Sequence, residues 1–147
     1  MGEALFPAGC ALVIGGSGGI GSVVAKELAR AGSDIAITYR RNKAKADEAR
    51  QAMETIGVTV TSHALTTGDR ASVAAAVEEA VAVHGRIHTV VYAAAMLTEQ
   101  VDIADISDAQ WTEAVEQDLG GFFNVLKATL PHLRAAGGGS YVNLGSA

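Results

Sequence analysis

The chain has 147 residues, of which 49% are hydrophobic and 18% are charged, and its formal net charge is −5. This length suits one domain, and the apolar content is high enough for a packed core, which excludes an intrinsically disordered chain. The acidic balance, with no basic run that contains interleaved aromatic residues, argues against a nucleic-acid-binding surface.

Targeting signals are not evident in the sequence. The N-terminal stretch MGEALFPAGCALVIGG lacks the positive region and the cleavage site of a signal peptide. No apolar run reaches the ~20 residues needed to cross a bilayer. The single cysteine, Cys10, cannot form an internal disulfide and is interpreted as a buried thiol. We therefore expect a cytoplasmic protein that does not bind a membrane.

Short apolar segments alternate along the chain with longer segments whose apolar residues recur at helical spacing. This alternation predicts an α/β fold, an open and doubly wound parallel sheet with about five strands in this chain. Glycines at 32, 57 and 85 follow the first three helices, at the position where a left-handed cap is common. The expected strands are 10–14, 34–38, 58–65, 87–95 and 140–144, and the expected helices are 19–31, 42–56, 69–84 and 107–135.

Two of these helices have a defined apolar side. Asp69 predicts the N-cap of the third helix, because its carboxylate can accept from backbone N–H groups of the first turn. Both helices follow short apolar strands, which is the pattern of crossover connections. The apolar sides are formed by Ile20, Val23, Val24 and Leu28 in the first helix and by Val73, Val77 and Val81 in the third.

The helix predicted for 107–135 is the longest. Ser107 is expected to cap its start, and Pro131 lies late in it, where proline can kink or end a helix. Trp111 and the Phe122–Phe123 pair are interpreted as core or interface residues.

The stretch VIGGSGGIG, residues 13–21, follows the first strand and opens the first helix. In this context Gly15 allows a tight turn, Gly19 lets a pyrophosphate approach the backbone, and Gly21 lets the helix pack closely. The backbone N–H groups at the helix start, at the positive end of its dipole, would hold the anion. A flexible turn without a ligand is the alternative interpretation. The contacts predicted for this loop are Gly15, Ser17, Gly18, Gly19, Ile20 and Gly21.

The spacing G-x-x-x-G-x-G in this context resembles the short-chain dehydrogenase/reductase family, and the resemblance continues along the chain. GDRASV at 68–73 is similar to the family's acidic turn, and YAAA at 92–95 lies where the family has Asn-Asn-Ala-Gly. QDLGGFF at 117–123 lies where the family has a helical asparagine, and NLGSA at 143–147 lies at its catalytic-serine strand. The resemblance implies a Rossmann-like fold, a nicotinamide cofactor and a small carbonyl or alcohol substrate.

The same resemblance implies roles for individual residues. Ser146 falls at the catalytic serine, and Asp118 replaces the asparagine that keeps a water in the proton relay. The family's Tyr-x-x-x-Lys pair would follow residue 147, so 1–147 is expected to be the front part of a dinucleotide-binding domain, inactive alone. Homo-oligomers through the helix at 107–135 are also implied. Further cofactor contacts are expected at Thr66, Ala93, Ala94 and Ala95.

Three positions depart from the family. Ile14 replaces a threonine, and Tyr92 replaces the first asparagine of the Asn-Asn-Ala-Gly turn. Because these two residues end strands that are neighbours in the resembled sheet, we expect them to have changed together, an apolar contact replacing a polar one. The third departure, Asp118, adds negative charge that should raise the pKa of any nearby tyrosine. Ser146 as a turn serine and Asp118 as a helix-surface residue are the alternative interpretations.

The residues after the second strand favour NADP(H) over NAD(H). Tyr39, Arg40 and Arg41 stand where an acidic residue would accept from the ribose 2′-hydroxyl of NAD. A guanidinium can instead bind a 2′-phosphate through two parallel hydrogen bonds. The alternative is that both arginines are solvated residues at a helix entrance.

Three functional alternatives remain at this point. The leading hypothesis is an NADP-dependent short-chain oxidoreductase, and the second is a nucleotide-binding module or an inactive homologue of that family. The third, a methyltransferase-type α/β domain, shares the glycine loop but usually has an acidic residue after the second strand, and this sequence has none there. No metal is expected, because the four histidines, His63, His84, His88 and His132, show no metal-ligand spacing.

Overall fold

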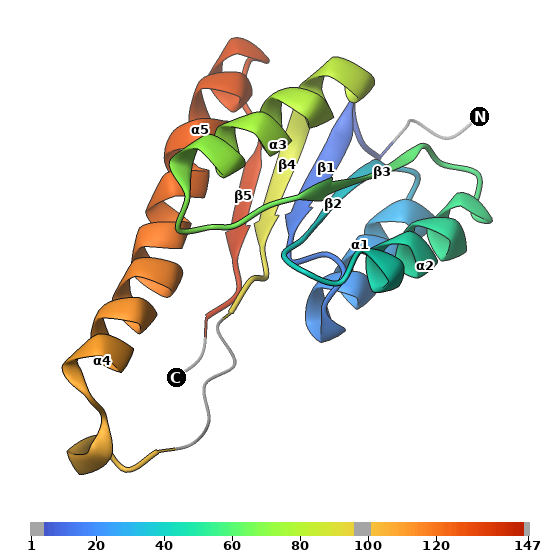
Figure 1. Cartoon of the computed structure of the whole chain (residues 1–147). Helices are drawn as coiled ribbons and strands as arrows, with labels where there is room; N and C mark the ends of the chain where they lie inside the picture. The colour runs from blue at the N-terminus through green and yellow to red at the C-terminus, as the bar shows by residue number, and fades with distance from the viewer. Residues whose placement is uncertain (1–4, 96–100, 146–147) are drawn as a thin grey trace.

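The computed structural model describes residues 5–95 and 101–145. Its strands are parallel and form one sheet in the order β3-β2-β1-β4-β5, which confirms the predicted doubly wound α/β fold. Helices α1 and α2 cover one face, and α3 and α5 cover the other (Figure 1). The strands are β1 (Cys10–Ile14), β2 (Asp34–Tyr39), β3 (Val60–Ala64), β4 (Ile87–Tyr92) and β5 (Ser140–Asn143). The helices are α1 (Gly19–Arg30), α2 (Lys43–Glu54), α3 (Arg70–His84), α4 (Asp108–Ala114) and α5 (Gly121–Ala135), with a 3₁₀ turn η1 (Ile103–Asp105) and a π-helical turn η2 (Val115–Gly120).

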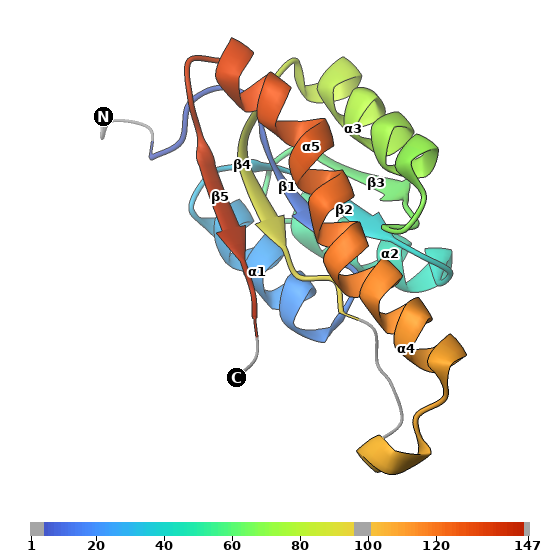
Figure 2. The same ribbon diagram turned by 90° about the vertical axis from the view of Figure 1, so that its left-hand side faces the viewer.

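Each face of the sheet has its own apolar core, because β1 is fully buried and its side chains alternate between the two faces. Leu12 and Ile14 belong to the core beneath α3 and α5, which lie side by side over the sheet in Figure 2. Ala11 and Val13 belong to the core beneath α1 and α2. The central strands β1, β2 and β4 are therefore largely buried, whereas the edge strand β5 is largely exposed.

Helix α1 contacts the sheet mainly through small residues, and only part of its predicted apolar side reaches the core. Its buried residues are Gly21, Ala25 and Ala29. Of the predicted apolar side, Ile20 and Val23 are 69% and 61% exposed, whereas Val24 and Leu28 are partly buried and pack against the core. The helix approaches the preceding loop most closely at Gly21, where a Cβ would clash with the Gly15 carbonyl oxygen.

The helix predicted for 107–135 consists of three pieces: α4, the π-helical turn η2 and α5. Ser107 caps α4 as predicted, in a reciprocal capping box with Gln110. Pro131 lies inside α5 and does not end it. Trp111 is 62% exposed and is not a core residue, whereas Phe122 packs edge-on against the rings of Tyr92 and Tyr141.

The other predicted boundaries hold with small shifts. Asp69 caps α3 by accepting from the N–H groups of Ala71 and Ser72. Gly85 has the predicted left-handed cap conformation at the end of α3, with φ 73°. Strand β4 ends at Tyr92 rather than at residue 95, because the chain leaves the sheet after Ala93 donates to the Ile14 carbonyl.

Candidate functional site

The loop between β1 and α1 is anchored to the neighbouring strand β2. The Gly15 N–H donates to the Thr38 hydroxyl over 3.0 Å, and the Ser17 N–H donates to the Thr38 carbonyl over 3.4 Å. Gly15 has φ 78°, the left-handed conformation expected of the tight turn. Thr38 is only 2% exposed, so this anchor is protected from water. The loop is thus held in one conformation before any ligand arrives.

The first turn of α1 presents backbone donors that the helix itself does not use. The first N–H in the helical ladder is that of Ser22, which donates to the Gly18 carbonyl over 3.0 Å. The N–H groups of Gly19, Ile20 and Gly21 come before it and have no intrahelical acceptor. The N-cap residue, Gly18, offers no side-chain cap. Three donors at the positive end of a helix dipole form a site for an anion.

Two glycines in this turn have different steric requirements. A Cβ on Gly21 would lie 2.2 Å from the Gly15 carbonyl oxygen, so no side chain fits there. A Cβ on Gly19 would meet no atom within 4 Å. Gly19 therefore borders open space at the helix mouth, whereas Gly21 is required by the packing of the loop.

A cleft of about 290 Å³ opens beside this turn, at the carboxyl ends of β1, β2 and β4. Ligands of open α/β sheets bind at this edge, where the strand order reverses. Here β1 pairs with β2 on one side and with β4 on the other, so the reversal falls at the cleft. The cleft is lined by Ile14, Gly15, Ser17, Gly18, Thr38, Tyr39, Arg40, Leu65, Thr67, Tyr92, Ala93, Ala94, Ala95, Gln117 and Asp118.

The structure brings most of the predicted site residues to this cleft. The predicted residues in its lining are Gly15, Ser17, Gly18, Tyr39, Arg40, Ala93, Ala94, Ala95 and Asp118. Gly19, Ile20 and Gly21 are at the helix mouth beside it but are not in the lining, and neither are Arg41 and Thr66. Ser146 lies outside the described residues. The roles assigned to all of these residues stay predictions.

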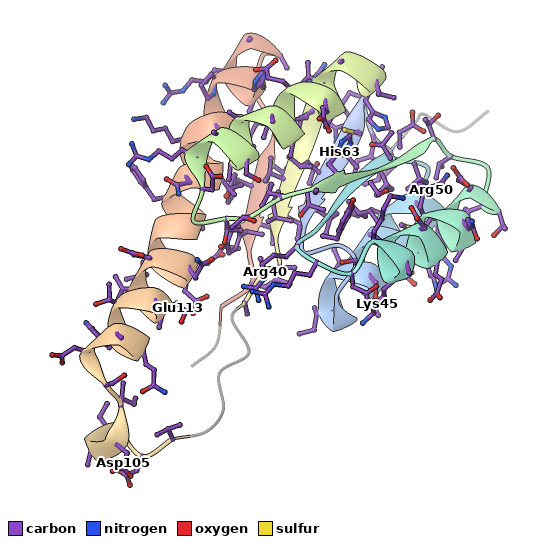
Figure 3. The ribbon with its side chains drawn as sticks, in the orientation of Figure 1. Arg40, Lys45, Arg50, His63, Asp105 and Glu113 are labelled. Carbon is purple, nitrogen blue, oxygen red and sulfur yellow. The ribbon has the colours of Figure 1, made fainter. Side chains whose placement is uncertain are left out.

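Arg40 extends from the end of β2 at the carboxyl edge of the sheet (Figure 3). Its side chain is exposed, lines the cleft and forms no ion pair with any residue in the ranges 5–95 and 101–145. Arg41 is exposed as well, but it does not reach the cleft. Of the two arginines, only Arg40 therefore has the position that binding a ligand phosphate in this cleft requires.

The family profile described as "short chain dehydrogenase" matches residues 9–147. The chain belongs to the short-chain dehydrogenase family. This membership decides against the methyltransferase-type alternative, and it agrees with the parallel sheet and the glycine loop described above.

Several short-chain dehydrogenases resemble the chain over half of their own length. Sorbose reductase sou1 of Schizosaccharomyces pombe is 30% identical over 132 residues, which cover 89% of this chain and 52% of that protein. The 3-oxoacyl-[acyl-carrier-protein] reductase FabG of Staphylococcus aureus is 27% identical over 92% of this chain and 55% of its own length. A short-chain type dehydrogenase/reductase structure from Mycobacterium ulcerans superimposes with a TM-score of 0.89 at 31% identity, covering 96% of this chain and 52% of that one. The chain thus spans about half the length of these relatives.

Ile14 and Tyr92, two of the departures from the short-chain dehydrogenase pattern, are paired in the structure. They are register partners at the ends of β1 and β4, as expected. Both are buried in the core beneath α3 and α5. The Tyr92 ring packs edge-on against Phe122, with 5.6 Å between the ring centroids. An apolar contact therefore stands where the family has a polar pair.

Asp118, the third departure from the short-chain dehydrogenase pattern, lies in η2 and faces the same region. The pKa of Tyr92 is raised, mainly because its hydroxyl is buried and in smaller part by the charge of Asp118. A hydrogen bond with the Thr67 side chain acts in the opposite direction. The predicted influence of Asp118 on a nearby tyrosine is thus confirmed, although burial is the larger cause. Tyr92 consequently stays a neutral hydroxyl at ordinary pH.

Thr67 and Gln117 are site residues that the sequence analysis missed. The Thr67 hydroxyl donates to the Gln117 carbonyl over 3.3 Å, and the Asn124 amide donates to the Thr67 carbonyl over 3.0 Å. These bonds join the loop after β3 to η2 and α5. No motif marks either residue, because the contacts form between segments about 50 residues apart in sequence. Only the sheet topology, which places both segments at one edge, could have suggested them.

The histidines have structural partners within the described part of the chain. The two ring nitrogens of His63 form hydrogen bonds with Glu79 over 2.9 Å and with Thr61 over 2.8 Å. The Thr61 hydroxyl also forms a hydrogen bond with His84 over 2.9 Å. His88 contacts Ser33 and Thr89. No group of three or more metal-ligating side chains occurs within 5–95 and 101–145. Among the helices of these ranges, none is long and apolar enough to cross a membrane.

Proposed function

We propose that this chain forms the cofactor-binding part of an NADP-dependent short-chain oxidoreductase that acts on a small carbonyl or alcohol. The observation that carries the proposal is the uncapped first turn of α1, whose three N–H donors open beside the cleft. Relatives named as reductases and dehydrogenases support an oxidoreductase, and the cleft lies where α/β sheets bind nucleotides.

The residues present fit a phosphorylated dinucleotide. The N–H groups of Gly19, Ile20 and Gly21 would hold the pyrophosphate, and Gly19 leaves room for it. Arg40, which has no ion-pair partner among the described residues, would hold the 2′-phosphate. Ala93, Ala94 and Ala95 would border the part of the cofactor nearest β4. The bound nicotinamide would supply or accept the hydride.

Fluorescence titration with NADPH and NADH tests this function. We expect NADPH to bind at least tenfold more tightly, because a charge-assisted hydrogen bond contributes about 1.5–3 kcal/mol. Arg40→Ala should weaken NADPH binding about tenfold and leave NADH binding unchanged. Lys45→Ala is the matched control, since Lys45 is an exposed cation on α2 outside the cleft. Failure to bind either nucleotide would refute the function, and equal affinities in the wild type would refute the NADP preference.

A nucleotide-binding module without turnover is the second candidate. Asp118 at the relay position and Tyr92 in place of an amide favour it, because both change groups that the family uses around the reacting atoms. Oxidation of NADPH in the presence of a panel of ketones and aldehydes, measured by absorbance, would contradict this candidate. A cytoplasmic location and self-association through α4 and α5 are parts of the proposal in either case.

A further inference from the structure

The Gln117 carboxamide is a polar group in the cleft without a protein partner. Its side chain is half-buried and lines the cleft. The backbone carbonyl of Gln117 accepts from Thr67, but the side-chain amide makes no hydrogen bond with any residue that the structure describes. A half-buried amide loses contact with water and retains donors and an acceptor. Such a group is stabilised when a ligand supplies the missing bonds.

The amide lies at the end of the cleft next to β3. A Cβ placed on Gly68, in the loop after β3, would lie 3.0 Å from Gln117 Nε2 and 3.4 Å from Oε1. Strand β3 pairs with β2, whose end carries Arg40. Gln117 and Arg40 therefore both border the cleft near the ends of β2 and β3.

The backbone that carries this amide is held by a chain of hydrogen bonds. The Thr67 hydroxyl bonds the Gln117 carbonyl, and Asn124 of α5 bonds the Thr67 carbonyl. Arg70 of α3 donates to the Asn124 side chain over 3.1 Å. Gln117 itself lies in the π-helical turn, a feature often found at functional sites. These contacts hold the Gln117 backbone at the edge of the cleft before a ligand binds.

We propose that Gln117 reads the base of the bound dinucleotide and selects adenine. This inference rests on the proposed function, because Arg40 at the 2′-phosphate places the same ribose, and hence its base, beside Gln117. A side-chain amide can pair with an adenine edge by accepting from the N6 amino group and donating to N7. Hypoxanthine carries a carbonyl oxygen in place of the N6 amino group. This oxygen would face the Gln117 amide oxygen, and two acceptors cannot form a hydrogen bond.

Among the lining residues that the structure describes, Gln117 is the only one with a side-chain amide, which joins a carbonyl acceptor to an NH₂ donor. Arg40 only donates, Leu65 is apolar, and the Thr67 hydroxyl proton is already given to the Gln117 carbonyl. Base selection in this cleft is therefore assigned to a single residue.

The test compares two fluorescent cofactors that differ only in the base, NADPH and reduced nicotinamide hypoxanthine dinucleotide phosphate. Their dissociation constants are measured for the wild-type chain, for Gln117→Leu and for the control Gln110→Leu, a glutamine of α4 outside the cleft. We expect the wild type and the control to prefer NADPH about tenfold, as one bidentate amide–base pair would allow. Gln117→Leu should bind both cofactors with nearly equal affinity.

Each outcome has a defined meaning. A wild type that binds both cofactors equally well overturns base selection and leaves the proposed function standing. An equal loss for both cofactors in Gln117→Leu also overturns it, because the amide then serves packing or the ribose. Absence of binding by either cofactor to the wild type refutes the proposed function itself. Circular dichroism and thermal unfolding of Gln117→Leu establish that the variant is folded.

Discussion

Ile14 and Tyr92 lie opposite one another at the ends of β1 and β4, and we expect their contributions to stability to be coupled. Ile14→Thr puts an unpaired hydroxyl into the core, and Tyr92→Asn removes the ring that packs against Phe122. Together the two substitutions restore a polar pair. The double variant should therefore be about 1 kcal/mol more stable than the sum of the single effects predicts.

Urea unfolding of the four proteins measures this coupling as a difference of unfolding free energies. Ile14→Thr combined with Met53→Leu is the control, since Met53 lies in the core on the opposite face of the sheet. That pair should be additive within about 0.5 kcal/mol. Additivity of the Ile14 and Tyr92 substitutions would remove the idea that these positions changed together.

At the scale of residues, prediction succeeded where the backbone needs a particular residue and failed where a side chain acts across the fold. Gly15 could be placed because a left-handed turn demands glycine. The Thr38 anchor and the Gln117 amide could not, because threonine and glutamine are compatible with many environments. Their roles arise from the neighbouring segment, which a single sequence does not specify.

At the scale of elements, spacing located the helices and strands but not their irregularities. The π-helical turn inserts into an otherwise regular pattern, and apolar spacing alone does not distinguish it from a continuous helix. In α1 the prediction held in part, because Val24 and Leu28 pack against the core while the fully buried positions are Gly21, Ala25 and Ala29. Periodicity identifies a core face only where that face is built from large side chains.

The helical stretch from α4 to α5 exposes apolar side chains that we expect to mediate pairing of two copies of this chain. Trp111, Leu119 and Phe123 are 62%, 69% and 50% exposed. Leu119→Glu with Phe123→Glu should weaken self-association at least tenfold, because a dimer would bury these charges without partners. Light scattering over a range of concentrations measures the effect. Val83→Glu, on an exposed apolar site of α3, should leave association unchanged, and a wild type that is monomeric throughout would contradict the expectation.

At the scale of the whole molecule, the two ends of the sheet differ in chemistry. The carboxyl ends of the strands open onto the cleft and its donors. At the opposite end, His88 at the start of β4 is 3% exposed, contacts Ser33 and Thr89, and stacks on Phe6. His84, the last residue of α3, contacts Thr61 and has a buried Nδ1 without a partner among the described residues. One end is thus suited to a ligand, and the other holds the layers together through neutral imidazoles.

This second end should make the fold sensitive to acid. Burial lowers the pKa of both His84 and His88, in His88 with a further contribution from Arg86. A histidine with a lowered pKa in the folded state takes up a proton more readily in the unfolded state, so acid favours unfolding. The contribution of such a neutral histidine to the free energy of unfolding is complete above about pH 6.5 and is lost as the pH falls below that value. The wild-type melting temperature should therefore fall by a few degrees between pH 7.5 and pH 5.5. His84→Gln with His88→Gln should show a smaller fall, whatever its stability at pH 7.5, whereas His132→Gln on α5 should follow the wild type. Equal falls in all three proteins would show that these two imidazoles do not govern the response to acid.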